Sequence, residues 1–318
     1  MPPPGDGFPE GMKALAYSEF GGSDRFTVTD LPDPHIGPDT LLVRVVAAGL
    51  NPVDYKLREG YLRGLIDVAS PAVPGWDVAG IVEKVGLDTP EFEVGDRVLA
   101  YARADVVQHG SVAELMPVPV RTAAHIPDGL SFEDAAALPL AGLTALQSVL
   151  RSGLGEGDTV LVHNAAGGVG SFGVQLARLR GARVIGTASA GKHDYVRGLG
   201  AEPVAYGEGL VAAVAELAPD GVDVVLDFVG GTALDSTREL LRDGGFVVSI
   251  ADSRAATEFG GISLWVRPDA AQLAELAGLA ADGTLKIERA ASYPLAEAAE
   301  AYRELESGHT RGKIIVTI

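Results

Sequence analysis

The chain has 318 residues, of which 47% are hydrophobic and 21% charged, a balance typical of a globular protein with one large domain or two ordinary ones. Its formal net charge of −18 argues against nucleic acid and anionic membrane as partners, because both recruit basic surfaces. The absence of cysteine excludes disulfides, thiol nucleophiles and cysteine-bound zinc. The six histidines are scattered and form no H-E-x-x-H pattern, so we predict no metal site.

The N-terminus has neither the basic start nor the apolar stretch of a signal peptide. We interpret residues 1–11 as a disordered leader. The sequence also lacks an apolar run long enough to cross a membrane. Together these features predict a cytoplasmic protein.

Residues 12–120 are rich in short β-prone segments separated by Gly, Pro and Asp, which predicts a small barrel or rolled sheet. The expected strands are 12–17, 26–30, 41–48, 78–85 and 97–100.

The pattern changes at Ser131, which is predicted to cap a helix with Asp134 at its third position, and residues 135–150 favour helix. From Thr159 strands and helices alternate, as in a parallel, doubly wound sheet. The expected strands there are 159–163, 182–187, 202–205, 222–229 and 245–250. Beyond Pro268 we expect a helix at 270–281, a strand at 284–290, a helix at 295–307 and a strand at 312–318.

The most informative segment is a Gly-rich turn between the strand at 159 and the helix that follows it. Gly167 lets the backbone approach a pyrophosphate, and Gly170 lets the helix start close to the strand. The helix N-terminus offers free N–H groups to the phosphates, and Ala165 replaces the usual first glycine. This βαβ unit predicts a dinucleotide site at Ala166, Gly167, Gly168, Val169 and Gly170. The helix should bury Val174, Leu176, Ala177 and Leu179.

The end of the second strand of this unit indicates which dinucleotide is bound. An NAD site usually has an acid there for the ribose hydroxyls, whereas this chain has Thr187 and Ser189, with Lys192 just beyond. A ribose phosphate would find hydroxyls and a cation and meet no acid before Asp194, so NADPH is favoured over NADH. Lys192 has a second interpretation, as an ordinary solvated cation at a helix start.

Several motifs in one order resemble the medium-chain dehydrogenase/reductase superfamily, in its zinc-independent quinone oxidoreductase (zeta-crystallin-like) branch. The matching stretches are 48–54, 74–80, 95–98, 165–170 and 308–313. The resemblance implies an α/β protein with a GroES-like β-barrel domain (12–123 and 267–318) and an inserted Rossmann NADP-binding domain (124–266). Zinc-dependent members have a cysteine near Asn51 and a histidine at Trp76, and they carry a four-cysteine lobe that this chain lacks.

Without a Lewis acid to polarise an alcohol oxygen, ordinary alcohol oxidation is not expected. The resemblance implies instead hydride transfer from NADPH to a quinone or to the C=C bond of an α,β-unsaturated carbonyl compound. Two alternatives remain open: an enoyl reductase of a polyketide or fatty-acid type pathway, and a non-catalytic NADPH-binding sensor or structural protein.

The family pattern places three candidate catalytic residues opposite the nicotinamide. The amide of Asn51 would bond the substrate carbonyl or the cofactor ribose, unless Asn51-Pro52 only makes a turn. Tyr55 and Lys56 would stabilise or protonate the enolate, unless Tyr55 is a packing aromatic and solvent supplies the proton. The further cofactor contacts implied are Thr144, Tyr206, Phe228, Val229, Ser249, Ile250, Arg311 and Lys313, with Arg311 and Lys313 reaching the adenosine phosphate.

Residues 262–266, Ile-Ser-Leu-Trp-Val, form a short apolar run after the fifth strand of the doubly wound sheet. An edge strand of this kind is normally covered or blunted by charge. In the superfamily the equivalent strand pairs across a two-fold axis, which implies a homodimer. The alternative is a strand buried within one subunit.

Overall fold

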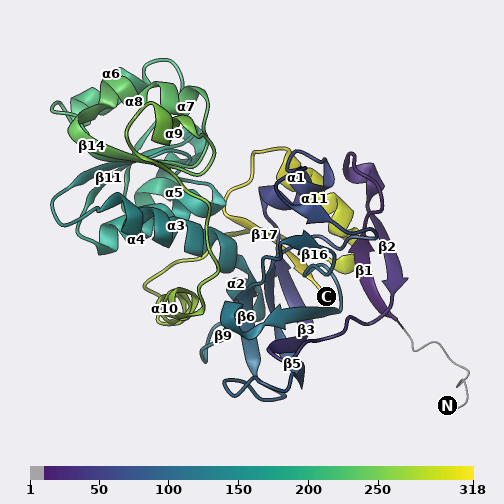
Figure 1. Ribbon diagram of the computed structural model, residues 1–318. Helices are drawn as coiled ribbons and strands as arrows, with labels where there is room; N and C mark the ends of the chain where they lie inside the picture. The colour runs from purple at the N-terminus through teal and green to yellow at the C-terminus, as the bar shows by residue number, and fades with distance from the viewer. Residues whose placement is uncertain (1–10) are drawn as a thin grey trace, which may run out of the picture.

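The computed structural model describes residues 11–318, which form two lobes (Figure 1). The predicted leader therefore lies outside the described residues except for Gly11. The lobe that holds the C-terminus is a GroES-like barrel whose main sheet has the order β16-β17-β3-β5-β6-β9, with β8 also paired to β3. Its strands are β3 (Thr40–Gly49), β5 (Asp77–Val85), β6 (Arg97–Tyr101), β8 (Leu115–Pro119), β9 (Ala123–His125), β16 (Arg289–Pro294) and β17 (Lys313–Thr317).

Two short pairs and two helices complete this lobe. The pairs are β1 (Met12–Ala16) with β2 (Thr27–Leu31), and β4 (Asp67–Val68) with β7 (Val106–Val107). Helix α1 (Pro52–Arg58) follows β3 directly and packs on α11 (Ala298–Glu306) from the end of the chain. Arg58 is fully buried between them and donates to Glu306 and to the Gly21 carbonyl. The chain therefore returns from the second lobe to fix α1, which begins next to Asn51.

The second lobe is a Rossmann fold with an entirely parallel six-stranded sheet in the order β12-β11-β10-β13-β14-β15. Side chains of β10 alternate between two cores, because Val160 and Val162 face the layer of α3 and α4 while Leu161 faces that of α6 and α8. The strands are β10 (Thr159–Val162), β11 (Arg183–Thr187), β12 (Glu202–Val204), β13 (Val222–Asp227), β14 (Leu241–Ser249) and β15 (Ile262–Ser263).

The helices of this lobe cover both faces of the sheet (Figure 1). They are α3 (Pro139–Ser152), α4 (Gly168–Leu179), α5 (His193–Gly198), α6 (Leu210–Leu217), α7 (Thr232–Asp235), α8 (Thr237–Leu240) and α9 (Arg254–Thr257). Helix α2 (Phe132–Ala137) packs on β3 and β5 of the barrel, and α10 (Ala270–Ala281) contacts both α3 and β9. Within residues 11–318, none of the helices has the length and apolar character needed to span a bilayer.

The predicted fold class is confirmed, and most predicted elements lie where expected, but two local predictions were wrong. Residues 135–150 are helical as expected, although they divide between two helices because Pro139 begins a new one. The strand expected at 284–290 lies at 289–294, where it pairs with β17. Leu179 is about half exposed, at 52%, because it stands at the last turn of α4. The helix start at Ser131 is confirmed, since its hydroxyl accepts from the Asp134 N–H.

Candidate active site

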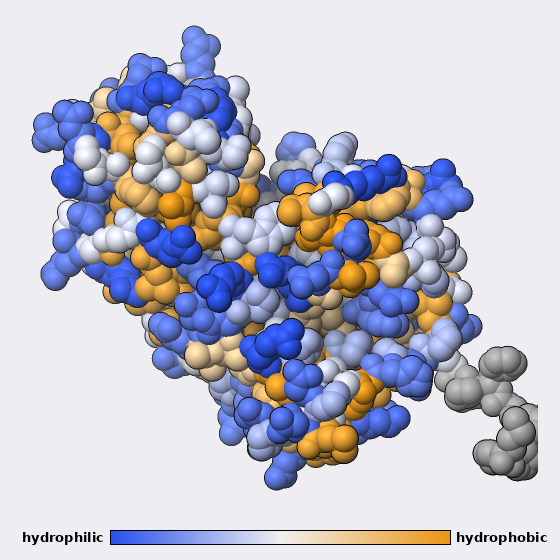
Figure 2. Space-filling view, in the orientation of Figure 1, coloured by the Kyte–Doolittle hydropathy of each residue, from blue (hydrophilic) through white to orange (hydrophobic). Residues whose placement is uncertain are grey.

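A cavity of about 520 Å³ lies between the two lobes. Figure 2 shows the notch between the lobes, with hydrophobic surface on the barrel lobe beside it. Residues from α1 and β17 of the barrel and from the carboxyl ends of β13 and β14 line it together. Of the predicted site residues, the cavity brings together Asn51, Tyr55, Lys56, Thr144, Gly167, Gly168, Val169, Phe228, Val229, Ile250 and Lys313.

The Gly-rich turn is shaped to receive a pyrophosphate. Gly167 stands at the cap position of α4, where no side chain occupies the free N–H groups of the helix start. A Cβ on Gly170 would overlap the Asn164 carbonyl and come within 2.9 Å of Ala165 Cα. The same turn binds the barrel, since the Ala166 carbonyl accepts from the Gly312 N–H at 3.2 Å. A dinucleotide cofactor thus fits the residues present, with its phosphates at the turn.

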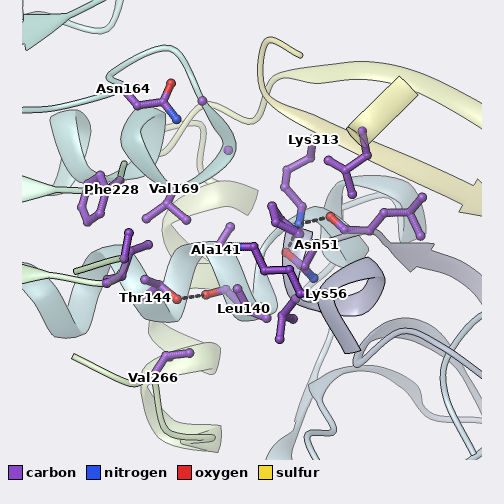
Figure 3. Close-up of a pocket in the computed structure, with 18 of the residues that line it drawn as sticks. Asn51, Lys56, Leu140, Ala141, Thr144, Asn164, Val169, Phe228, Val266 and Lys313 are labelled. Carbon is purple, nitrogen blue, oxygen red and sulfur yellow. Dashed lines mark hydrogen bonds between the residues drawn. The ribbon is translucent and has the colours of Figure 1, made fainter. Parts of the chain in front are cut away.

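One side of the cavity is mostly apolar. Val169 and Phe228 approach it from the Rossmann lobe, and Trp76 from the barrel (Figure 3 labels the first two). The Thr144 hydroxyl donates to the Leu140 carbonyl at 2.6 Å, so it is engaged within α3 rather than free. Tyr55 is half-buried, and burial together with the nearby Glu59 and Glu306 raises the pKa of its phenol, which keeps it protonated. Lys56 is exposed at the cavity rim.

A buried polar cluster forms the barrel side of the cavity (Figure 3). The Lys313 ammonium donates to the Leu50 carbonyl at 2.7 Å and to Asn51 Oδ1. The Asn51 amide donates to Asp77 Oδ2 at 2.8 Å and lies 3.4 Å from the Gly49 carbonyl. Asp77 Oδ1 accepts from the Leu140 N–H at 2.9 Å, at the start of α3. The cluster therefore joins β3, β5, β17 and α3 at one point.

Two buried carboxyl groups in this cluster have unusual pKa values. Burial raises the pKa of Asp77 to about 6, although Lys313, the Asn51 amide and the Leu140 N–H lower it. Burial also raises the pKa of Asp54 to about 7, against the hydrogen bond from the Asn51 N–H. Burial lowers the pKa of Lys313, and the two carboxylates oppose that effect. The pKa values of these two carboxyl groups therefore lie near neutral pH.

The side chain of Lys313 does not lie where the sequence analysis predicted. It was predicted to reach the adenosine phosphate, but its ammonium bonds Asn51 next to α1. Only its stem passes the phosphate turn, where a Cβ on Gly168 would come 3.0 Å from Lys313 Cδ. The reason is local: β17 pairs with β3, and the Leu50 N–H donates to the Ile314 carbonyl, so Lys313 starts beside Asn51.

The predicted role of the Asn51 amide also needs correction. Its amide was expected to bond a substrate carbonyl or the cofactor ribose, but the NH2 group already faces Asp77 and the Gly49 carbonyl. Asn51 also begins α1 with Pro52, so the turn interpretation holds alongside the polar one. Asp77 was missed as a site residue. Its position within the 74–80 motif was the available signal, but its partners were not visible from the sequence.

The remaining predicted residues fall outside the cavity lining. Thr187 is buried and accepts from the Asn164 N–H at 3.0 Å, and Ser249 is buried and donates to Asp227 at 2.6 Å. Neither hydroxyl is placed for a cofactor phosphate. Tyr206 is 65% exposed, and Ser189 is partly exposed after β11. Ala166 and Gly170 contribute to the turn through their backbone.

Two cations lie close together beyond the end of β11. Lys192 donates to the carbonyls of His309 and Thr310, at 2.9 and 3.3 Å. Arg311 pairs with Glu288 and lies 5.0 Å over the Tyr195 ring. Burial and the charge of Arg311 both lower the pKa of Lys192. The C-terminal segment of the barrel therefore contacts the Rossmann lobe just beyond β11.

Comparison with known proteins agrees with this architecture. Residues 37–128 match the alcohol dehydrogenase GroES-like domain, and residues 199–316 match a family described as zinc-binding dehydrogenase. The chain is 36% identical to the NADPH-dependent alkenal/one oxidoreductase of Arabidopsis thaliana chloroplasts, over 97% of this chain and 80% of that protein. The chain belongs to the medium-chain dehydrogenase/reductase family, in its quinone oxidoreductase branch. It is an enzyme of the oxidoreductase class.

Two solved members of this family share its shape closely. The quinone oxidoreductase of Coxiella burnetii superposes with a TM-score of 0.88 at 33% identity, covering 96% of this chain and 99% of that one. A mycobacterial protein solved in complex with NADPH gives a TM-score of 0.83 at 30% identity, covering 96% and 100%.

The zinc named in the description of one matching family does not fit the residues at this site. Zinc prefers cysteine, histidine and carboxylate ligands, whereas the family resemblance puts Asn51 and Trp76 at the ligand positions. The two carboxylates that contact Asn51 are already engaged: Asp77 accepts from the Asn51 amide and the Leu140 N–H, and Asp54 from the Asn51 N–H. Across residues 11–318, no three His, Cys, Asp or Glu side chains are grouped to hold an ion. An ion bound through Asn51 Oδ1 would also meet the Lys313 ammonium.

Proposed function

We propose that this oxidoreductase is an NADPH-preferring, zinc-independent reductase of α,β-unsaturated carbonyl compounds and quinones. The observation that carries the proposal is a single cavity that joins a phosphate-binding turn to an apolar chamber with the Asn51–Lys313 cluster at its barrel side. The printed activity of the Arabidopsis relative supports the acceptor class, and the mycobacterial NADPH complex supports the cofactor. A cytoplasmic location remains a prediction.

The chain's own residues bind, orient and shield the reactants. Bound NADPH would supply a hydride to the β-carbon of the acceptor. The electrons of the C=C bond would then move toward the carbonyl oxygen to give an enolate, which is completed by a proton at the α-carbon. The turn from Gly167 to Gly170 holds the phosphates, while Val169 and Phe228 exclude water from the hydride path. Tyr55 and Lys56 stand at the cavity wall where a proton can reach the enolate.

A panel of acceptors tests the proposal. We expect the purified protein to oxidise NADPH with a simple enone and with a quinone, and to leave simple alcohols untouched when NADP⁺ is supplied. An α,β-unsaturated thioester belongs in the panel, because a strong preference for it would favour the enoyl reductase alternative. Ready oxidation of simple alcohols would show that the reaction class is wrong.

Cofactor preference is the next expected result. The first carboxylate after β11 is Asp194, which pairs with Arg197, while Lys192 and Arg311 stand near the adenosine end. We therefore expect NADPH to bind about tenfold or more tightly than NADH, a difference of about 1.4 kcal/mol. Titration of the protein with each nucleotide measures this, and equal affinities would refute the preference.

Activity is expected to survive removal of metal ions. Asn51 and Trp76 give zinc no thiolate, imidazole or carboxylate ligand, so dialysis against a strong chelator should leave turnover unchanged. Elemental analysis of the same sample provides the check. A stoichiometric metal that is lost together with the activity would contradict the expectation.

We further propose a homodimer formed through β15, which is the edge of the parallel sheet. Trp265 lines the cavity, so a substitution there would alter the active site as well as the proposed subunit interface. Ser263 is the better position, because it is exposed on the edge strand itself. In light scattering we expect the wild type and Ser263→Ala to be dimers and Ser263→Pro a monomer, since proline removes an edge N–H group. A monomeric wild type would end this proposal.

A further inference from the structure

Lys313 lines the cavity with its ammonium bonded to Asn51, the side chain that the family resemblance puts in place of a zinc ligand. Lys313 is 4% exposed and is one of the residues that line the cavity. It comes from β17, whereas Asn51 follows β3, and Figure 3 shows the two side chains pointing toward each other. A positive charge is therefore built into the protein at this place.

Lys313 and Asn51 differ in how their N–H donors are engaged. An ammonium group has three N–H donors, and Lys313 directs two of them to the Leu50 carbonyl and Asn51 Oδ1. Asp77 Oδ2 is 3.6 Å from the same nitrogen, which is an ion-pair distance but too long for a hydrogen bond. The Asn51 amide, by contrast, directs both of its N–H groups at protein oxygens. The third N–H of Lys313 therefore has only this long contact with Asp77, whereas both N–H groups of Asn51 have a protein oxygen within hydrogen-bond distance.

The surroundings fix this charge in place. Asp77 faces the ammonium from β5 and Asp54 from α1, and Tyr302 of α11 donates to Asp54 at 3.2 Å. In a buried site of low dielectric a charge acts more strongly than at the surface, where water screens it. Lys56 is also on the cavity wall but is exposed, so its charge is solvated. Of these two lysines, Lys313 is the preorganised one.

We propose that Lys313 is the catalytic cation of this enzyme, and that its third N–H, which meets Asp77 only at 3.6 Å, stabilises the negative oxygen formed on the acceptor when hydride arrives. The inference rests on the proposed function. It assigns to an ammonium group the task that the metal performs in the zinc-dependent relatives. No proton need leave Lys313: the enolate oxygen of an enone, or the anion of a hydroquinone, is held by charge and one hydrogen bond until a proton arrives from Tyr55, Lys56 or solvent.

Single-turnover kinetics at saturating NADPH and acceptor test the proposal. Loss of one preorganised donor to a developing oxyanion lowers the rate by about 10²- to 10³-fold, which is the effect expected for Lys313→Met, with NADPH affinity nearly unchanged. Lys84→Met, a change at an exposed lysine of β5 outside the cavity, should behave as wild type. If Lys313→Met instead weakens NADPH binding and leaves the rate of the saturated complex unchanged, Lys313 is a cofactor-binding residue and the proposal fails.

A second variant and a second probe keep the test decisive. Lys313→Met leaves Asp77 buried without its cation, so Asp77→Asn/Lys313→Met is prepared in case the single variant does not fold. The double variant should fold and stay slow; a wild-type rate would show that Lys313 only neutralises Asp77. The independent probe is 4-nitrophenol bound in the presence of NADP⁺, because its absorption reports its ionisation.

Wild type should lower the pKa of the bound phenol relative to both Lys313 variants, and equal values would overturn the proposal. This readout needs no turnover. A wild type that ionises the phenol but reduces no acceptor would therefore refute the proposed function while the assignment of Lys313 stands.

Discussion

Gly170→Ala is expected to weaken NADPH binding strongly. An added Cβ would overlap the carbonyl of Asn164 and the Cα of Ala165, which are backbone atoms that cannot move aside without displacing the turn. Overpacking of this kind costs about 1–3 kcal/mol. Because the displaced segment is the phosphate-binding turn itself, we expect the NADPH dissociation constant to rise by about 10- to 100-fold. Fluorescence titration with NADPH measures the change.

Gly278→Ala is the matched control for this substitution. Gly278 lies inside α10, and a Cβ there would meet nothing within 4 Å. Alanine is the better helix former by about 0.5–1 kcal/mol, so this variant should be slightly more stable and should bind NADPH as wild type does. If both variants bind NADPH normally, the turn is not the phosphate site.

The second large effect concerns the dependence of stability on pH. The pKa of Asp54 is raised from 3.8 to about 7 by burial, so folding favours its protonated form. Its stabilising contribution is complete below pH 4 and is lost as the pH rises through about 7. A shift of this size corresponds to at most about 4 kcal/mol. Asp54→Asn should remove the free-energy cost of ionising this buried carboxyl group. An amide oxygen at this position can still accept from the Asn51 N–H and from Tyr302.

Thermal unfolding of the two proteins across this pH range gives the result. Asp54→Asn and wild type should have similar stability near pH 4, and the variant should be the more stable above pH 7. Asp88→Asn, which removes an exposed carboxylate, controls for the change in net charge. A stability difference between Asp54→Asn and wild type that stays constant with pH would show that burial does not control this carboxyl group.

The sequence predicted those features that are encoded in neighbouring residues. The phosphate turn, the alternation of strands and helices after Thr159 and the cap at Ser131 each lie within a short segment, so their spacing is readable. The break at Pro139 was readable in principle as well, because proline begins helices more readily than it continues them.

The polar cluster could not be predicted in the same way. Lys313 and Asn51 are 262 positions apart and Asp77 is 26 beyond Asn51, so their contact depends on how β17 returns to pair with β3. The sequence offered all three residues in family motifs, yet only the register of these strands decides which partner each one meets. The same limit explains Thr187 and Ser249, whose hydroxyls are used by buried neighbours rather than by the cofactor side.

The central claim is that hydride passes from NADPH to the β-carbon of an unsaturated carbonyl compound inside the cavity between the lobes. The most direct test uses NADPH that carries deuterium at the reactive position of the nicotinamide, together with an enone and the purified, chelator-treated protein. Mass spectrometry and NMR of the product should show one deuterium at the β-carbon and hydrogen from solvent at the α-carbon. Consumption of NADPH without label in the product, or label on an alcohol carbon, would contradict the account.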